Sequence, residues 1–230
     1  MTIGARDIRR VRQVRTLACL TLLAVVALLM AWLAGLWAPS GEARGPGSRN
    51  RDTDHPTVLL VNADHPLPDD FRTPKLVTLA GTVPASGSRV KVAAEVAEPL
   101  RSLFAAARKA GLTRLYVAIG YRTAAEQRAL WKRAEDKSYV QRPGHSEHQT
   151  GWAVDLADLR VGDGEFGDSR AGRWLAGNAW RYGFILRYPP DKEELTGIAY
   201  EPWHYRYVGR PAARTCHDQG LVLEEYVRRA

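Results

Sequence analysis

Two short segments of this sequence contain the residue types that proteins use to bind divalent metal ions. In the first, His148 is followed seven residues later by Asp155, and in the second, Glu201 precedes His204 by three residues. Two imidazoles and one carboxylate suit Zn²⁺, and three protein ligands leave one position open for water, as in catalytic zinc sites. An ionised Glu201 beside that water is the expected general base and could pass the proton to a leaving amine. These residues are therefore candidates for a hydrolytic zinc site with His148, Asp155 and His204 as ligands.

Each of these residues also has a simpler interpretation when it is taken alone. His148 could be a hydrogen-bonding loop residue, Asp155 a turn or capping carboxylate, and His204 a half-buried ring in a strand. Pairs with these spacings recur by chance, so neither pair decides between a structural role and metal binding. Both segments nevertheless have distinctive surroundings, with Gly151 in the first and Trp203 directly before His204 in the second.

The pattern of apolar residues predicts the elements that come before the first segment. Apolar residues recur at helical spacing from Val92 to Ala107, which predicts a packed helix that ends at Gly111. Residues 113–120 predict a buried strand. A capping box at residues 123–126 then predicts the start of a second helix. The strand and this helix therefore meet at the sequence Gly-Tyr-Arg of residues 120–122.

The rest of the chain mixes strands and helices without a regular alternation. Strands are predicted at residues 152–156, 184–188 and 203–208, and helices from 169 to before 183 and over 221–229. Such a mixture indicates an α+β fold. We expect a single compact domain at residues 57–230, with a central, mostly antiparallel sheet flanked by helices.

The N-terminal part has the features of a membrane anchor. Residues 17–38 carry no charge and, as a helix, could cross a hydrocarbon core of about 30 Å. The basic segment 1–16, which contains five arginines, is expected to stay in the cytoplasm, and residues 39–56 have the composition of a flexible linker. A cleaved signal peptide is the alternative, but the apolar run is longer than its usual core. We expect a single-pass protein of the cell membrane with its domain outside the cytoplasm.

Charge and cysteine content narrow the classes of protein further. The net charge of +8 is shared equally by two parts of the chain. Residues 1–56 carry 8 Lys/Arg against 4 Asp/Glu and residues 57–230 carry 25 against 21, so each part contributes +4. The domain is therefore only mildly basic, and we expect no nucleic-acid partner. The two cysteines are Cys19, in the predicted membrane segment, and Cys216, so no disulfide within the exported domain is expected.

Strings of residues along most of the predicted domain resemble a known family, the VanY-type D-alanyl-D-alanine carboxypeptidases, which are related to the D-Ala-D-Ala dipeptidases. The matching strings share one order along the chain and lie at residues 60–62, 65–68, 120–123, 143–151, 182–189, 192, 196–197, 201–209 and 223–226. The family usually has an aliphatic residue where this chain has Trp152, and a serine where it has Ile119. Neither difference affects a proposed metal ligand, but both could reshape the pocket.

The resemblance implies roles for individual residues. It implies one Zn²⁺ held by His148, Asp155 and His204, with Glu201 as the catalytic base. It also implies substrate contacts from Arg122, Gln127 and Ser146. A guanidinium where a strand meets a helix can bind a terminal carboxylate through two hydrogen bonds, which is the role expected of Arg122. Trp203 could form a wall of the substrate pocket or fill the core.

The expected activity is zinc-dependent hydrolysis of the C-terminal D-Ala of peptidoglycan stem peptides. An L,D-carboxypeptidase acting on tetrapeptide stems is the nearest alternative, and a non-catalytic cell-wall-binding module is a third. An endopeptidase is less favoured, because Arg122 indicates recognition of a free carboxylate. The expected partners are peptidoglycan stem peptides and the cytoplasmic membrane, and the sequence makes no prediction of oligomeric state.

Overall fold

The computed structural model describes residues 56–229 of the chain. The predicted segments 1–16 and 17–38, and all but the last residue of the predicted linker 39–56, lie outside the described residues. None of the helices in the described part is both long and apolar enough to span a membrane. The α-helices of this part are α2 (Ala94–Lys109), α3 (Ala124–Arg133), α4 (Arg170–Asn178), α5 (Glu193–Thr196), α6 (Arg210–Gln219) and α7 (Leu223–Arg229).

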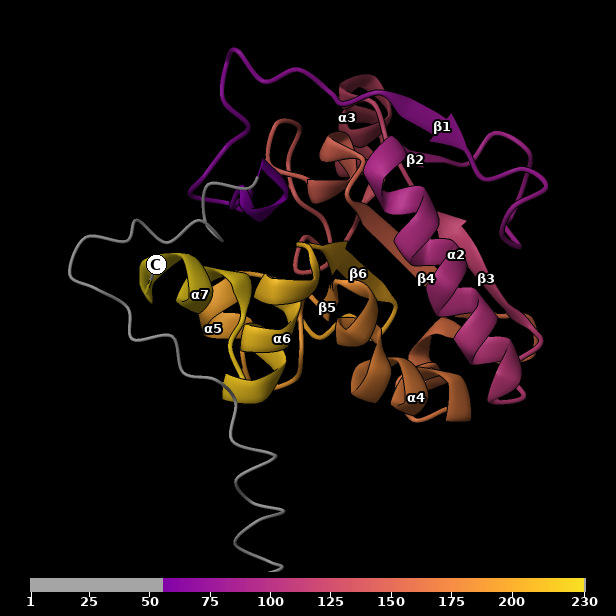
Figure 1. Ribbon diagram of the computed structural model, residues 1–230. Coiled ribbons are helices and arrows are strands. Elements are labelled where there is room, and N and C mark those ends of the chain that lie inside the picture. The colour runs from indigo at the N-terminus through magenta and orange to yellow at the C-terminus, as the bar shows by residue number, and fades with distance from the viewer. Residues whose placement is uncertain (1–55, 230) are drawn as a thin grey trace, which may run out of the picture. The chain divides into compact units, whose positions relative to one another are not determined.

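Two antiparallel sheets organise the described part of the chain (Figure 1). The strands are β1 (Leu76–Thr78), β2 (Lys91–Ala93), β3 (Leu115–Ile119), β4 (Ala153–Asp158), β5 (Phe184–Leu186) and β6 (His204–Tyr207). β1 and β2 form a small sheet, and the other four strands form the central sheet in the order β3-β4-β6-β5. Every pair of neighbouring strands in the central sheet is antiparallel, as expected.

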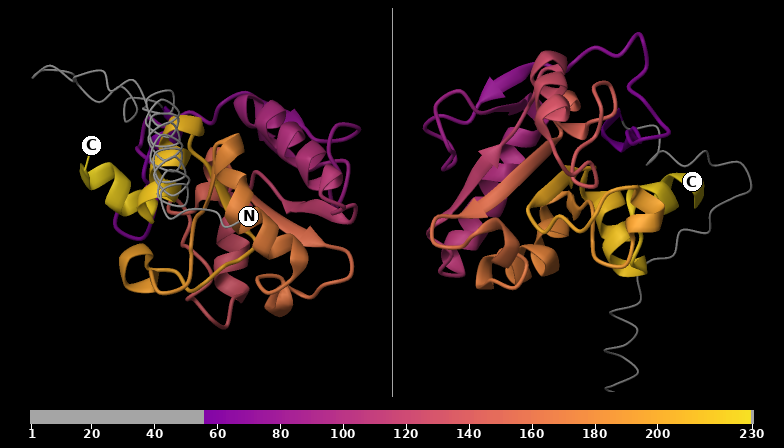
Figure 2. Two further views of the ribbon diagram at one scale, coloured as in Figure 1. Left: turned by 60° about the horizontal axis from the view of Figure 1, so that its bottom comes forward. Right: turned by 180° about the vertical axis from the view of Figure 1, so that it is seen from behind.

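Helix α2 and the central sheet enclose the larger hydrophobic core. The buried face of α2 includes Val96, Leu100 and Leu103, which belong to one cluster with Val117 of β3 and Leu156 of β4. Figure 1 shows α2 in front of β3 and β4, and the view from behind in Figure 2 shows these strands in front of α2. The helix therefore covers one face of this part of the sheet, because its apolar residues lie on a single stripe.

A second, smaller core lies where the C-terminal helices pack beside β5. It includes Ile185 of β5, Ala213 and Cys216 of α6, and Leu223 and Tyr226 of α7. These side chains anchor the end of the chain against the sheet edge, so that helices flank the sheet here as well. The α+β fold predicted from the sequence is confirmed for the described residues.

The structure corrects several predicted boundaries. Val92 fits the helical spacing of α2, but it lies in β2 and pairs with Val77, so that α2 begins at Ala94. The helix predicted from residue 169 begins as expected, because the Ser169 side chain accepts a hydrogen bond from the amide of Gly172. Helical structure ends before Gly183, as predicted, but it is divided into α4, which ends at Asn178, and a 3₁₀ helix, η4 (Ala179–Tyr182).

Candidate metal centre and active site

The three predicted metal ligands meet where the central sheet joins a short 3₁₀ helix. Asp155 of β4 and His204 of β6 are directly opposite each other in the antiparallel register, which brings their side chains together. His148 lies in η2 (Glu147–Thr150), immediately before β4. One ligand atom from each residue lies within 4.8 Å of the others, and all three residues are buried. The spacing read from the sequence therefore corresponds to a real cluster.

A backbone carbonyl fixes the orientation of the His148 ring. Its Nδ1 lies 2.8 Å from the oxygen of Gly120. Because a carbonyl oxygen can only accept, Nδ1 carries the hydrogen and Nε2 is left with a free lone pair. A side chain at Gly120 would bring its Cβ to 2.3 Å from the backbone oxygen of Lys91, so only glycine fits here. Gly120 therefore lies close to the backbone of Lys91, and its carbonyl orients a predicted metal ligand.

The lone pair on Nε2 of His148 faces an oxygen of Asp155, and this arrangement indicates whether a cation fits the cluster. His148 Nε2 lies 3.3 Å from Asp155 Oδ1, and His204 Nδ1 lies 3.0 Å from the same oxygen. Two acceptors at this distance repel each other unless a positive charge lies between them. A metal ion bound by both nitrogens and the carboxylate removes this conflict. The donor set of two imidazoles and one carboxylate therefore fits Zn²⁺.

The ionisation of the cluster also favours a bound cation. Burial lowers the pKa of His148, which keeps this ring in the neutral form that binds metals. For Asp155, burial raises the pKa, but the nearby imidazoles outweigh it and hold the pKa well below its ordinary value. For His204, burial lowers the pKa, but hydrogen bonds with Asp155 and Glu147 outweigh it and raise the pKa to about 9. The site therefore attracts positive charge, either as a proton or as a metal ion.

Glu201 lies beside the cluster, as predicted. Its Oε2 is 3.7 Å from His204 Nδ1, and its amide donates to the carbonyl of Tyr188. Burial raises its pKa to about 8, whereas His204 and Arg122 act in the opposite direction. The positive charge of a bound metal ion would lower this pKa and favour the ionised form. A carboxylate in this environment is suited to accepting and then releasing a proton.

Arg122 is held in the same pocket by Gln127. Arg122 Nη1 donates to Gln127 Oε1 over 2.8 Å, and the Gln127 amide nitrogen donates to the carbonyl of Gln141. The backbone amide of Arg122 donates to the carbonyl of His148 over 3.1 Å. Gln127 is almost fully buried, so the structure assigns it a role in orienting Arg122. The predicted capping box at Thr123, which begins α3, is also present.

The residues that line this pocket include most of those predicted from the sequence. They are Arg122, Gln127, Leu130, Tyr139, Val140, Gln141, Ser146, Glu147, His148, Asp155, Tyr188, Ile198, Glu201 and His204. Ser146 precedes η2, and its side chain makes no capping hydrogen bond with the described residues. Trp203 is not among the lining residues. The centroid of its ring lies 6.3 Å from that of Tyr139, which does line the pocket. The ring of Trp203 therefore lies next to a residue of the pocket wall.

A buried network of charged residues next to the cluster was not predicted. Glu147 accepts hydrogen bonds from Arg187 and Arg206, each over 2.7 Å, and Arg187 also binds Glu224 through two nitrogens. Burial raises the pKa of Glu147, but the two guanidinium groups outweigh it and hold the pKa well below its ordinary value. These residues are far apart in the sequence. Only their presence in the matching strings could have drawn attention to them, because no local spacing connects them.

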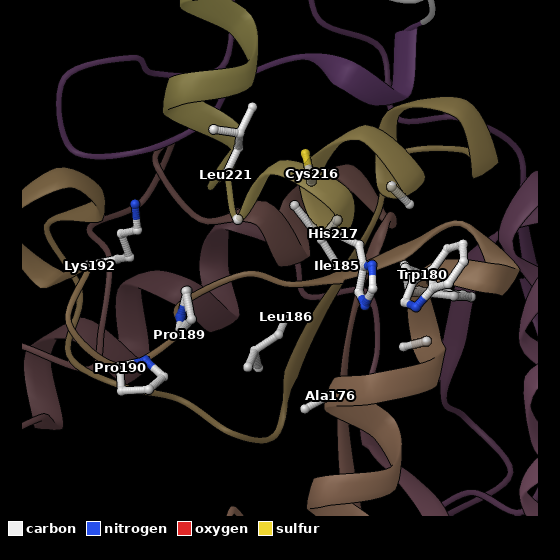
Figure 3. A pocket seen from close by; sticks show the side chains of 14 residues that line it. Ala176, Trp180, Ile185, Leu186, Pro189, Pro190, Lys192, Cys216, His217 and Leu221 are labelled. Carbon is white, nitrogen blue, oxygen red and sulfur yellow. The ribbon is translucent and has the colours of Figure 1, made fainter.

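A larger apolar pocket lies away from this chemistry, between η4, β5 and α6. It has a volume of about 230 Å³. Figure 3 shows Trp180, Ile185, Leu186 and Leu221 around it, with the ring of His217 beside that of Trp180. The two rings are stacked with centroids 4.5 Å apart. Within the described residues, the only group of three or more potential metal ligands is the one at His148.

Comparisons with known proteins agree with this geometry. The profile of the family described as VanY, D-alanyl-D-alanine carboxypeptidase, matches residues 89–210, which include every residue of the candidate metal site. The chain is 39% identical over 188 residues to the D-alanyl-D-alanine carboxypeptidase of Enterococcus faecalis. This match covers 74% of the present chain and 65% of the relative, slightly less than two thirds of its length.

Two solved structures are similar in fold as well as in sequence. One is the LdcB LD-carboxypeptidase, with 36% identity and a TM-score of 0.66 over 74% of this chain and 85% of that one. Another is a vancomycin resistance D,D-pentapeptidase VanY in complex with Zn(II), with 37% identity and a TM-score of 0.62 over 74% of this chain and 98% of that one. Because the family profile covers more than half of the sequence and these folds agree, this chain belongs to the VanY family of D-alanyl-D-alanine carboxypeptidases.

Proposed function

We propose that this protein is a zinc-dependent D-alanyl-D-alanine carboxypeptidase that removes the C-terminal D-Ala of peptidoglycan stem peptides. The observation that carries the proposal is the pocket in which a metal-ligand cluster, a buried carboxylate and a guanidinium face one another. His148, Asp155 and His204 would hold one Zn²⁺. When bound, the ion would polarise the scissile carbonyl and favour deprotonation of the attacking water.

Glu201 moves the proton that the reaction must transfer. As the water oxygen bonds to the carbonyl carbon, Glu201 accepts its proton, and as the C–N bond breaks, it delivers that proton to the nitrogen of the leaving D-alanine. The position of its carboxylate, 3.7 Å from a nitrogen of His204, supports this role. Burial of Glu201 also excludes bulk water, which strengthens the electrostatic interactions within the pocket.

Arg122 selects a peptide with a free C-terminus. Gln127 holds Nη1 of Arg122, which leaves Nε and Nη2 to bind the terminal carboxylate in a bidentate manner. Ser146 lines the same pocket and offers a hydroxyl group to the peptide backbone of the substrate. Trp203 supports the ring of Tyr139 at the pocket wall.

The proposal is tested with the purified full-length chain, Zn²⁺ and defined stem peptides. We expect mass spectrometry to show that a pentapeptide stem loses one D-alanine, and that a chelator prevents this. A pentapeptide stem that stays intact with zinc bound would refute the proposal, and a non-catalytic wall-binding module would be favoured only if a tetrapeptide stem also stayed intact.

An L,D-carboxypeptidase is the second candidate, and the similarity to the LdcB LD-carboxypeptidase supports it. The two activities differ in the stereochemistry of the residue before the scissile bond and in stem length. The same experiment with a tetrapeptide stem separates them, because an L,D-carboxypeptidase would convert it to a tripeptide and leave the pentapeptide intact.

We also propose that the protein is a single-pass membrane protein with residues 57–230 outside the cytoplasm. The uncharged run of residues 17–38 follows a segment with five arginines, which favours a cytoplasmic N-terminus. Residues 39–56 would then act as a flexible linker that lets the domain reach the cell wall. A protease added to intact, wall-stripped cells should degrade the domain. Full protection of the domain until the membrane is broken would contradict this topology.

A further inference from the structure

We propose that Glu147 is a positioning residue that holds His204 with Nδ1 facing the metal ion. This inference rests on the zinc site proposed above. Glu147 Oε2 lies 3.3 Å from His204 Nε2, on the side of the ring opposite to Asp155. A carboxylate at this place accepts the Nε2 hydrogen and leaves the lone pair of Nδ1 free for the metal. Partners of this kind commonly set the orientation and basicity of metal-binding histidines.

The two carboxylate oxygens of Glu147 have different partners. Oε1 accepts hydrogen bonds from Arg187 Nε and Arg206 Nη1, each over 2.7 Å, whereas Oε2 faces His204. The guanidinium groups are themselves fixed, because Arg206 also donates to the backbone carbonyls of Thr57 and Leu59. The carboxylate is therefore held rigidly, and so is the ring that it contacts.

Glu224 provides a matched comparison within the same network. It binds Arg187 through two hydrogen bonds of 2.8 and 2.6 Å, and it accepts another from Asn62 over 3.0 Å. Glu224 is buried like Glu147, but among the described residues it makes no hydrogen bond or ion pair with a metal ligand. If the two glutamates only balanced buried arginines, removing either charge would have the same consequence. A difference between them in zinc affinity would identify the positioning role.

The substitution Glu147→Gln has a specific predicted effect on the His204 ring. The two guanidinium donors would still require an oxygen, so the new amide would turn its oxygen toward them and its NH₂ group toward His204 Nε2. That arrangement favours the tautomer with hydrogen on Nδ1, which competes with the metal ion. We expect zinc affinity to fall about 10- to 100-fold, the usual range for loss of such a partner.

The test measures zinc affinity of the full-length chain by competition with a chromophoric chelator. We expect Glu147→Gln to weaken zinc binding about 10- to 100-fold. The zinc affinity of Glu224→Gln should stay within about threefold of the wild-type value, which is clearly smaller than the effect expected for Glu147→Gln. Circular dichroism checks that each variant is folded. Equal weakening in both variants, or none in Glu147→Gln, would overturn the proposal.

A measurement on the unchanged protein keeps the inference testable if Glu147→Gln does not fold. Long-range ¹H–¹⁵N NMR spectra of the zinc-loaded protein should show His204 with hydrogen on Nε2 and metal on Nδ1. Metal on Nε2 would overturn the proposal. Failure of the proposed function is a separate outcome, because a protein that binds zinc without hydrolysing any stem peptide could still show this arrangement of His204.

Discussion

The metal pocket and the apolar pocket beside α6 differ in almost every property except that each contains a histidine. The apolar pocket is lined mainly by carbon atoms, and its histidine, His217, stacks on Trp180 and pairs with its own neighbour Asp218. In the metal pocket, His148 and His204 each have a fixed partner on one nitrogen and face Asp155 with the other. In this protein, the two histidines of the metal pocket therefore differ from His217 in having partners on both ring nitrogens.

The two pockets also differ in how their polar groups are supported. Around the metal pocket, charged side chains from η2, β6 and α7 form hydrogen bonds in the protein interior, where an unpaired charge would cost several kcal/mol. Around the apolar pocket, the one buried ionisable group is the thiol of Cys216, among the residues that the structure describes. The metal pocket holds charged groups in fixed positions, whereas the apolar pocket is formed mainly by packed apolar side chains.

The largest expected difference between the pockets comes from replacing their histidines. His204→Ala removes a ligand that also contacts Asp155 and Glu201, so we expect loss of bound zinc and of detectable hydrolysis. His217→Ala is the matched control and should leave both unchanged, because this ring is partly exposed and lies in the other pocket. Elemental analysis and a D-alanine release assay measure the two effects. Retained zinc in His204→Ala would show that the metal is bound elsewhere.

The next effect separates metal binding from catalysis within the metal pocket. Glu201→Ala should lower kcat about 10²-fold or more, because the reaction loses its positioned proton acceptor. Zinc content should stay close to that of the unchanged protein, since Glu201 is not part of the ligand cluster. Zinc loss in this variant would make Glu201 a fourth ligand and the site structural. An unchanged rate with zinc retained would remove the proposed mechanism.

A smaller effect is expected at the carboxylate-binding end of the pocket. Arg122→Lys should fold and bind zinc but lose about 10- to 100-fold in kcat/KM, because one ammonium cannot replace a bidentate guanidinium. The comparison is made with a substrate whose C-terminus is blocked as an amide. Both proteins should cleave it at similarly low rates. If Arg122→Lys lost as much activity on the amide as on the free acid, Arg122 would not be the carboxylate contact.

The sequence predicted the metal pocket far better than the surroundings that hold it. His148, Asp155, Glu201 and His204 lie in two short strings, so that local spacing makes them candidates and the resemblance identifies them. The sequence predicted the two strands that contain Asp155 and His204, but it did not indicate that these strands are neighbours. The register that places the two residues opposite each other was therefore not predicted. The pairing of Val92 with Val77 was missed, because a tertiary contact overrode the helical spacing of Val92.

The buried arginines show why the rest could not be predicted. Arg187 is separated from Glu147 by 40 positions and from Glu224 by 37, so no window of sequence contains the network. Charged residues are ordinarily exposed, and composition gives no sign that these are buried. Gln127 was predicted to touch substrate because of its place in a matching string, and its contacts with Arg122 and Gln141 could not be read from that string.

The smallest expected effect concerns the thiol in the apolar pocket. Burial raises the pKa of Cys216 to about 12, so the folded protein keeps this thiol protonated at pH values where an unfolded chain, with a pKa near 9.0, loses the proton. Because the folded pKa is the higher one, this contribution to stability is complete below pH 9 and declines as the pH rises further. Between pH 8 and pH 10 the unchanged protein should lose about 1 kcal/mol more stability than Cys216→Ala. Chemical denaturation at the two pH values measures this difference, and zinc content and kcat of the variant should stay unchanged. A loss of activity in Cys216→Ala would show that the apolar pocket is coupled to the metal pocket, and the contrast between the two regions would no longer hold.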